Sequence, residues 1–114
     1  MEISKENSEF IEELQIIEQH LQNFLAQKQM MQVELQEVSN ALNELNKTKD
    51  EVYKILSGIM MKADKNSLVK DLEERKKLFE LRISSIEKQE HILEDKTLKL
   101  REKIASGMKK ENKK

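Results

Sequence analysis

Two histidines, His20 and His91, and many carboxylates are the residues that could carry out acid–base or metal chemistry. Metal sites need such ligands at set spacings, and acid–base catalysis needs them in an enclosed, partly dry pocket that shifts their pKa values. Each histidine lacks a second histidine, a cysteine or a carboxylate set at a metal-binding spacing, and two glycines cannot build a phosphate-binding loop. We therefore expect a protein that is not an enzyme and that has no metal site and no cofactor.

The composition indicates long helices rather than a compact core. The chain of 114 residues is 38% charged and 37% hydrophobic but only 4% aromatic, and it has no proline, cysteine or tryptophan. Such a composition is typical of helices that bury side chains only along a seam. The carboxylates are therefore expected on solvated helix surfaces.

Charge balance and hydropathy limit the possible partners. The chain has 22 acidic and 21 basic residues, whereas nucleic-acid-binding proteins usually have a strongly basic face. No apolar run approaches the roughly 18 residues of a membrane span, and the N-terminus lacks the apolar region of a signal peptide. We expect a cytoplasmic protein with no nucleic-acid partner and no membrane partner.

The first half of the chain carries apolar residues at alternating steps of four and three, interrupted only at Lys28. A mean spacing of 3.5 residues keeps one stripe of a helix facing a partner, so the pattern predicts a coiled-coil helix over residues 8–50. Asn7 or Ser8 is expected to cap its start. The stripe consists of Phe10, Leu14, Ile17, Leu21, Phe24, Met31, Leu35, Val38, Leu42 and Leu45.

A second heptad array predicts another helix, over residues 66–108. Asp64, Asn66 and Ser67 offer capping oxygens before it, and Gly107 stands where it is expected to end. Its d positions are Leu72, Phe79, Ile86, Leu93, Leu100 and Gly107. Its a positions are Val69, Lys76, Ile83, Glu90, Thr97 and Ile104. Residues 1–7 and 109–114 are expected to be flexible tails.

The two helices are nearly equal in length and joined by a short segment, which favours a long antiparallel two-helix coiled coil. Two registers remain open, with the numbers of paired residues adding to about 114 or about 121. In either register Lys28 and Glu90 fall in adjacent layers of the seam. The two charges therefore either pair with each other or each extend out of the seam into solvent.

The segment between the helices, residues 51–64, has the pattern of a β-hairpin. β-branched and aromatic residues flank Ser57-Gly58, a two-residue loop that contains glycine. Strands are predicted near residues 52–56 and 59–63, which gives a mainly α fold with a small β-hairpin inserted between the two helices. The alternative is a helical continuation or an ordered loop.

Both faces of such a hairpin would be largely apolar. The predicted pairing sets Leu56 against Ile59, Ile55 against Met60, and Tyr53 against Lys62. An isolated two-stranded hairpin is marginal in water, and its open edges invite another chain. The segment is therefore predicted to be an oligomerisation surface made by Val52, Tyr53, Ile55, Leu56, Gly58, Ile59, Met60 and Met61.

A family resemblance rests mainly on the run Val-Tyr-Lys-Ile-Leu-Ser-Gly-Ile-Met-Met-Lys, residues 52–62, set between two heptad helices. This arrangement resembles a β-class prefoldin subunit of the archaeal type, and the Gln-Lys-Gln-Met-Met-Gln-Val-Glu-Leu run of residues 27–35 is also in the family's style. The resemblance covers about residues 10–108 and makes residues 1–114 a single prefoldin-type subunit. One hairpin rather than two favours the β class over the α class.

The resemblance implies an ATP-independent molecular chaperone that works as part of a hexamer of two α-class and four β-class subunits. Hairpins of the family assemble into a double β-barrel, and coiled-coil tips capture unfolded proteins, prevent their aggregation and pass them to a group II chaperonin. The implied partners are thus a prefoldin α subunit, unfolded client proteins and a group II chaperonin.

The client-binding tips would be the start of the first helix and the end of the second. Several apolar residues there lie outside the seam, where a coiled coil does not bury them. Off-seam residues such as Val33 and Leu81 also occur away from the tips, and scattered apolar residues are common on protein surfaces. The candidate client-binding residues are Phe10, Ile11, Leu14, Ile16, Leu98, Ile104 and Met108.

Two other functions stay open from the sequence. A coiled-coil tether or adaptor would use the middle segment to dock on one fixed partner. A helical-hairpin nucleic-acid-binding arm would need a basic stripe, which the near-zero net charge disfavours.

Overall fold

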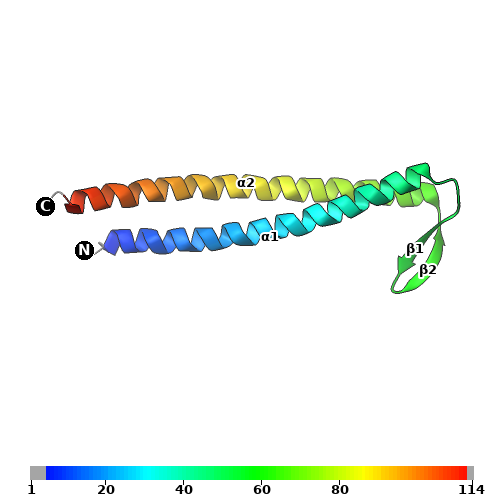
Figure 1. The fold of residues 1–114 in the computed structure, drawn as a ribbon, viewed down its shortest axis with the longest axis horizontal. Helices are drawn as coiled ribbons and strands as arrows, with labels where there is room; N and C mark the ends of the chain where they lie inside the picture. The colour runs from blue at the N-terminus through cyan, green and yellow to red at the C-terminus, as the bar shows by residue number, and fades with distance from the viewer. Residues whose placement is uncertain (1–4, 113–114) are drawn as a thin grey trace. The chain divides into compact units, whose positions relative to one another are not determined.

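A computed structural model describes residues 5–112 of the chain, with side chains described as far as Gly107. Two long helices are separated by a two-stranded antiparallel hairpin, which confirms the predicted mainly α fold (Figure 1). The elements in order are α1 (Lys5–Lys47), β1 (Val52–Leu56), β2 (Ile59–Ala63) and α2 (Lys65–Asn112). Neither of the described helices contains a stretch that is long and apolar enough to cross a membrane.

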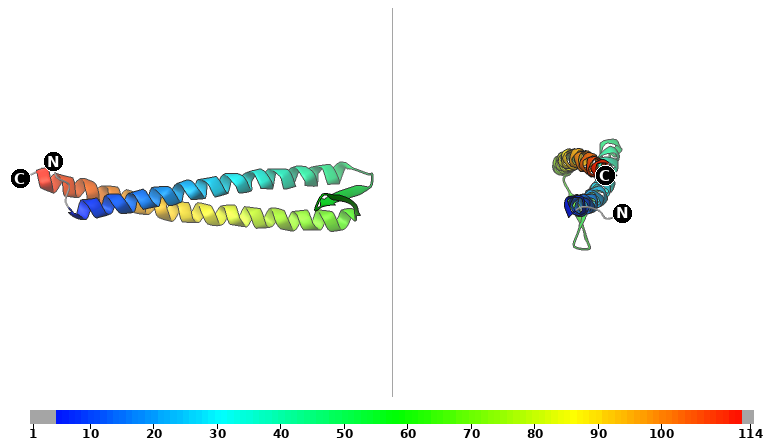
Figure 2. Two further views of the ribbon diagram at one scale, coloured as in Figure 1. Left: turned by 90° about the horizontal axis from the view of Figure 1, so that it is seen from below. Right: turned by 90° about the vertical axis from the view of Figure 1, so that its left-hand side faces the viewer.

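The chain divides into two compact units, which are described separately. The terminal unit combines Met1–Lys28 with Ser85–Lys114, and the hairpin unit is Gln29–Ser84. Within each unit, the segments of α1 and α2 lie side by side and run in opposite directions (Figure 2). The helix pairing is therefore antiparallel in both units, as the similar helix lengths and the short connection predict.

Burial in both units follows the predicted seam. Every buried apolar side chain occupies an a or d position of its helix, so the burial confirms the heptad assignment. The buried apolar residues are Ile17, Leu100 and Ile86 in the terminal unit and Val38, Leu42, Leu45 and Ile83 in the hairpin unit.

The pairing of Asn7 with Gly107 selects one of the two predicted registers. Asn7 is only 2% exposed, and a Cβ atom on Gly107 would come within 2.6 Å of Asn7 Oδ1. Their residue numbers add to 114, which corresponds to the first register. Both residues were expected at helix ends, yet both lie inside their helices. The missing side chain of Gly107 makes room for Asn7, although glycine costs a helix about 1 kcal/mol relative to alanine.

The helix boundaries differ from the predicted ranges by a few residues. Helix α1 begins before residue 8 and ends at Lys47, where Thr48 N–H donates to the Glu44 carbonyl and closes the last turn at 3.0 Å. Helix α2 continues to Asn112, so residues 109–112 of the expected C-terminal tail are helical. Residues 1–4 and 113–114 of the expected tails lie outside the described residues.

The start of α2 is capped by one of the predicted residues. Asp64 Oδ2 accepts hydrogen bonds from Ser67 N–H at 3.1 Å and from Ser67 Oγ at 2.9 Å. A carboxylate in this position also interacts favourably with the positive end of the helix dipole. Lys65 Nζ donates to the Thr48 carbonyl at 2.8 Å, which joins the start of α2 to the end of α1 beside the hairpin.

Candidate interaction surfaces

The hairpin loop has the backbone conformation that its sequence requires. Ser57 has a φ of 51° and Gly58 a φ of 78°. Two successive positive φ values are characteristic of a type I′ turn, whose twist matches that of the flanking strands. Glycine adopts this region freely, whereas serine does so less readily, so Ser57 carries most of the local conformational cost.

The strands pair in the predicted register, with Leu56 opposite Ile59 and Ile55 opposite Met60. Because side chains alternate along a strand, the register defines two faces. The Lys54 face carries Val52, Lys54, Leu56, Ile59, Met61 and Ala63. The Tyr53 face carries Tyr53, Ile55, Met60 and Lys62.

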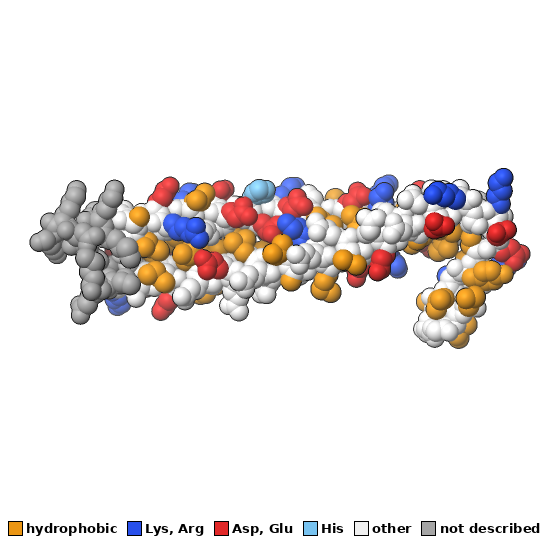
Figure 3. Space-filling model, in the orientation of Figure 1, with side chains coloured by type: hydrophobic (Ala, Val, Ile, Leu, Met, Phe, Trp, Pro, Cys, Tyr) orange, Lys and Arg blue, Asp and Glu red, His pale blue; other side chains and the backbone are white. Residues whose placement is uncertain are grey.

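Both hairpin faces expose large apolar side chains to solvent. Figure 3 shows hydrophobic side chains gathered over the side of the hairpin that is in view. A concentrated apolar surface of this kind marks a contact site, and an isolated hairpin gains little stability of its own. Six large apolar residues of the hairpin are each between 45% and 71% exposed: Tyr53, Ile55, Leu56, Ile59, Met60 and Met61. Val52 is half-buried, and Gly58 lies in the loop.

The Tyr53 face also contains a polar cluster that the sequence analysis did not identify. Glu51 Oε1 accepts a hydrogen bond from Lys62 Nζ at 2.9 Å, and Glu51 Oε2 accepts one from Tyr53 Oη at 3.0 Å. Both hydrogen bonds hold the pKa of the Glu51 carboxyl below its ordinary value, and the bond from Lys62 has the larger effect. The predicted strand pairing already indicates this cluster. Tyr53 lies opposite Lys62, and Glu51, two residues before Tyr53, projects from the same face.

The predicted client-binding residues of the terminal unit differ in their exposure. Ile16 is 56% exposed and Leu98 is 59% exposed, and the register places the two at the same level of the seam. Phe10, Leu14 and Ile104 are half-buried seam residues, and Ile11 beside the seam is also half-buried. Lys103 Nζ lies 5.5 Å from the centre of the Phe10 ring. Met108 lies outside the residues whose side chains are described.

An apolar hollow in the terminal unit was not predicted. It has a volume of about 280 Å³ and is lined by His20, Phe24, Gln89, Ile92 and Leu93. Phe24 and Leu93 are seam residues, whereas Ile92 projects beside the seam from a c position. The heptad assignment could have indicated this hollow, because residues at c and g of two antiparallel helices lie on the same flank of the helix pair.

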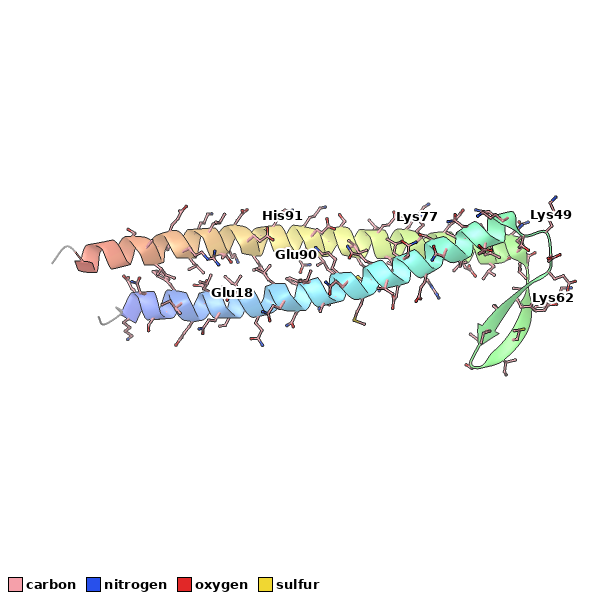
Figure 4. The ribbon with its side chains drawn as sticks, viewed as in Figure 1. Glu18, Lys49, Lys62, Lys77, Glu90 and His91 are labelled. Carbon is pink, nitrogen blue, oxygen red and sulfur yellow. The ribbon has the colours of Figure 1, made fainter. Side chains whose placement is uncertain are left out.

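The two charged seam residues of the terminal unit form an ion pair. Lys28 Nζ lies 2.8 Å from Glu90 Oε1, and the two side chains are 20% and 14% exposed. Figure 4 shows Glu90 on the side of α2 that faces α1. The hydrogen bond that Lys28 donates to Glu90, reinforced by the negative charge of Glu90, raises the pKa of Lys28 above its ordinary value of 10.5. The interpretation that the two charges meet in the seam is therefore confirmed.

Charge reversal tests this pair. Lys28→Glu or Glu90→Lys alone is expected to lower the melting temperature by about 5 °C, because each leaves two like charges in the seam. The double variant is expected to recover most of the loss, and strictly additive effects would contradict a direct pair.

Because the pKa of Lys28 is raised, the contribution of Lys28 to stability is complete below pH 10.5 and is lost as the pH rises through the higher folded-state value. Circular dichroism melts from neutral to alkaline pH provide the measurement.

The histidines and carboxylates do not form a metal-binding group in the described part of the chain. No group of three histidine, aspartate or glutamate side chains there comes close enough to hold a metal ion. His91 Nδ1 lies 3.6 Å from Glu94 Oε2, and both side chains are well exposed on α2. This pair is a surface contact rather than a binding site.

Known proteins resemble this chain over most of its length. A family model described as "Prefoldin subunit" matches residues 8–111. The prefoldin subunit beta of Archaeoglobus fulgidus is 30% identical over 105 residues, which is 90% of each chain. That of Caldivirga maquilingensis is 34% identical over 96 residues, which is 82% of this chain and 79% of the relative. The crystal structure of the prefoldin beta subunit from Thermococcus strain KS-1 superposes with a TM-score of 0.86 at 31% identity, covering 92% of this chain and 94% of that one.

Proposed function

Because this chain belongs to the prefoldin family and is a chaperone subunit of its β class, we propose that it holds unfolded proteins without using ATP. It assembles through its hairpin with α-class subunits, as four of the six subunits in a hexamer. The assembly works in the cytoplasm, prevents the aggregation of its clients and delivers them to a group II chaperonin.

The observation that carries this proposal is the exposed hairpin. Six large apolar side chains on both of its faces lie open to solvent, and the hydrogen-bonding edges of β1 and β2 have no neighbouring strand within the described chain. Hairpins of several subunits that close into a barrel remove these edges and bury the apolar faces. Assembly thus supplies the stability that a lone hairpin lacks.

Client capture is supported by the apolar surface of the terminal unit. Ile16 and Leu98 are more than half exposed although the seam beside them is well buried. Exposed apolar side chains bind the apolar segments that an unfolded protein presents. Phe10, Leu14 and Ile104, which are half-buried, extend this surface when the seam opens at its end.

Aggregation of chemically denatured proteins tests the proposed activity. The assembled complex is expected to suppress light scattering by several unrelated denatured proteins at near-stoichiometric ratios, equally with and without ATP. A tether or adaptor would bind one fixed partner and leave all the scattering curves unchanged. Protection of none of the test proteins by a correctly assembled complex would therefore overturn the chaperone proposal.

A further inference from the structure

The charges of the hairpin strands are all of one sign. Strands β1 and β2 have five residues each, and their only charged side chains are Lys54 and Lys62. Lys62 lies on the Tyr53 face and is paired with Glu51 at 2.9 Å. The Tyr53 face therefore brings its own neutralising carboxylate.

Lys54 has no such partner within the described chain. It projects from the middle of the Lys54 face, opposite Met61 and between Val52 and Leu56. No carboxylate of a described residue forms an ion pair with its ammonium group within 4.0 Å.

Two carboxylates lie in the same region without pairing with Lys54. Lys54 borders a hollow of about 140 Å³ that is also lined by Asp64 and Asp71. Asp64 already accepts two hydrogen bonds from Ser67 as the cap of α2. The Lys54 ammonium is thus the one strand charge that the described chain does not match with an ion pair.

We propose that the Lys54 face docks on the hairpin of a different chain, an α-class subunit, whose strand presents an aspartate or glutamate opposite Lys54. This inference rests on the proposed assembly through the hairpin. Covering the face removes water from the Lys54 ammonium, and a desolvated charge is strongly unfavourable unless an opposite charge meets it.

A second copy of this chain cannot supply that charge from its strands. The strands of the second copy offer only apolar side chains, a tyrosine and lysines. A lysine placed on a largely apolar edge segment opposes pairing with an identical segment, because like charges would meet or remain unpaired. Lys54 therefore disfavours self-association and favours a partner of opposite charge.

Substitutions at Lys54 test the inference through native mass and affinity for an α-class subunit. Lys54→Glu is expected to weaken binding to the α-class subunit at least tenfold, because it sets two carboxylates against each other. Lys54→Met is expected to make the chain self-associate at a concentration at least tenfold lower than the wild type. Lys70→Glu is the matched control, since Lys70 is exposed on α2 and has no ion pair, and it should change neither property.

The outcomes separate this inference from the proposed function. If the wild type assembles with the α-class subunit and Lys54→Glu assembles equally well, the inference is wrong while the proposed function stands. If the wild type does not assemble with an α-class subunit, the proposed assembly fails. The self-association of Lys54→Met is a separate test. If this variant self-associates no more than the wild type, Lys54 does not oppose self-association and the inference is wrong. Circular dichroism of each variant checks that the helices are intact.

Discussion

Replacing Ile55 and Ile59 together with lysine is expected to abolish assembly while leaving the helices folded. The two side chains lie on opposite faces of the hairpin and are 71% and 64% exposed in the isolated chain. Burying a large apolar side chain contributes about 1.5–3 kcal/mol, so the loss of two weakens association by about 3–6 kcal/mol, or at least about a hundredfold. Native mass spectrometry of the variant mixed with an α-class subunit measures this effect.

A matched pair of substitutions controls for the added charge. Val33 and Leu81 are 60% and 69% exposed on the helices of the hairpin unit, away from the hairpin. Lysine at both of these positions should leave assembly at the wild-type level, since exposed substitutions change stability by only about 0.5 kcal/mol. A hexamer that forms normally from Ile55→Lys/Ile59→Lys would show that the hairpin is not the assembly surface.

Replacing Ile16 and Leu98 together with serine is expected to lower client protection at least about threefold without changing the mass of the complex. Both side chains are more than half exposed in the terminal unit, so serine removes apolar contact area without opening the seam. Scattering of several denatured proteins, recorded against the concentration of the complex, gives the protection.

The control for this second result again uses Val33 and Leu81. These residues are as exposed as Ile16 and Leu98, but they belong to the hairpin unit. If serine at Val33 and Leu81 lowers protection as much as serine at Ile16 and Leu98, clients bind along the whole coiled coil. The assignment of the client site to the tips would then be wrong.

The sequence predicted the elements well because their patterns are local. The heptads identified which residues are buried in both units, and Ser57-Gly58 identified the strand pairing and its register. The heptads also placed Lys28 and Glu90 in neighbouring layers in either register, and the structure shows that the two charges pair rather than extend into solvent. Each of these predictions depends on residue type and spacing alone.

The remaining features depend on shapes that the heptads do not specify. Two registers one heptad apart both place a and d residues in the seam, and the fit of Asn7 against Gly107 identifies the one that the structure adopts. Gly107 was expected to end a helix because glycine usually does so, but here it provides space inside one. The sequence also did not show which residues of the tips are exposed. Ile11 beside the seam is half-buried, whereas Ile16, which points outward, is exposed.

The central claim is that the hairpin joins this chain to subunits of a different class. Native mass spectrometry of the intact chain, alone and mixed with an α-class subunit from the same source, tests it most directly. A hexamer that contains four copies of this chain and two α-class subunits is the expected result. A mixture in which this chain keeps the mass it has alone would contradict the claim.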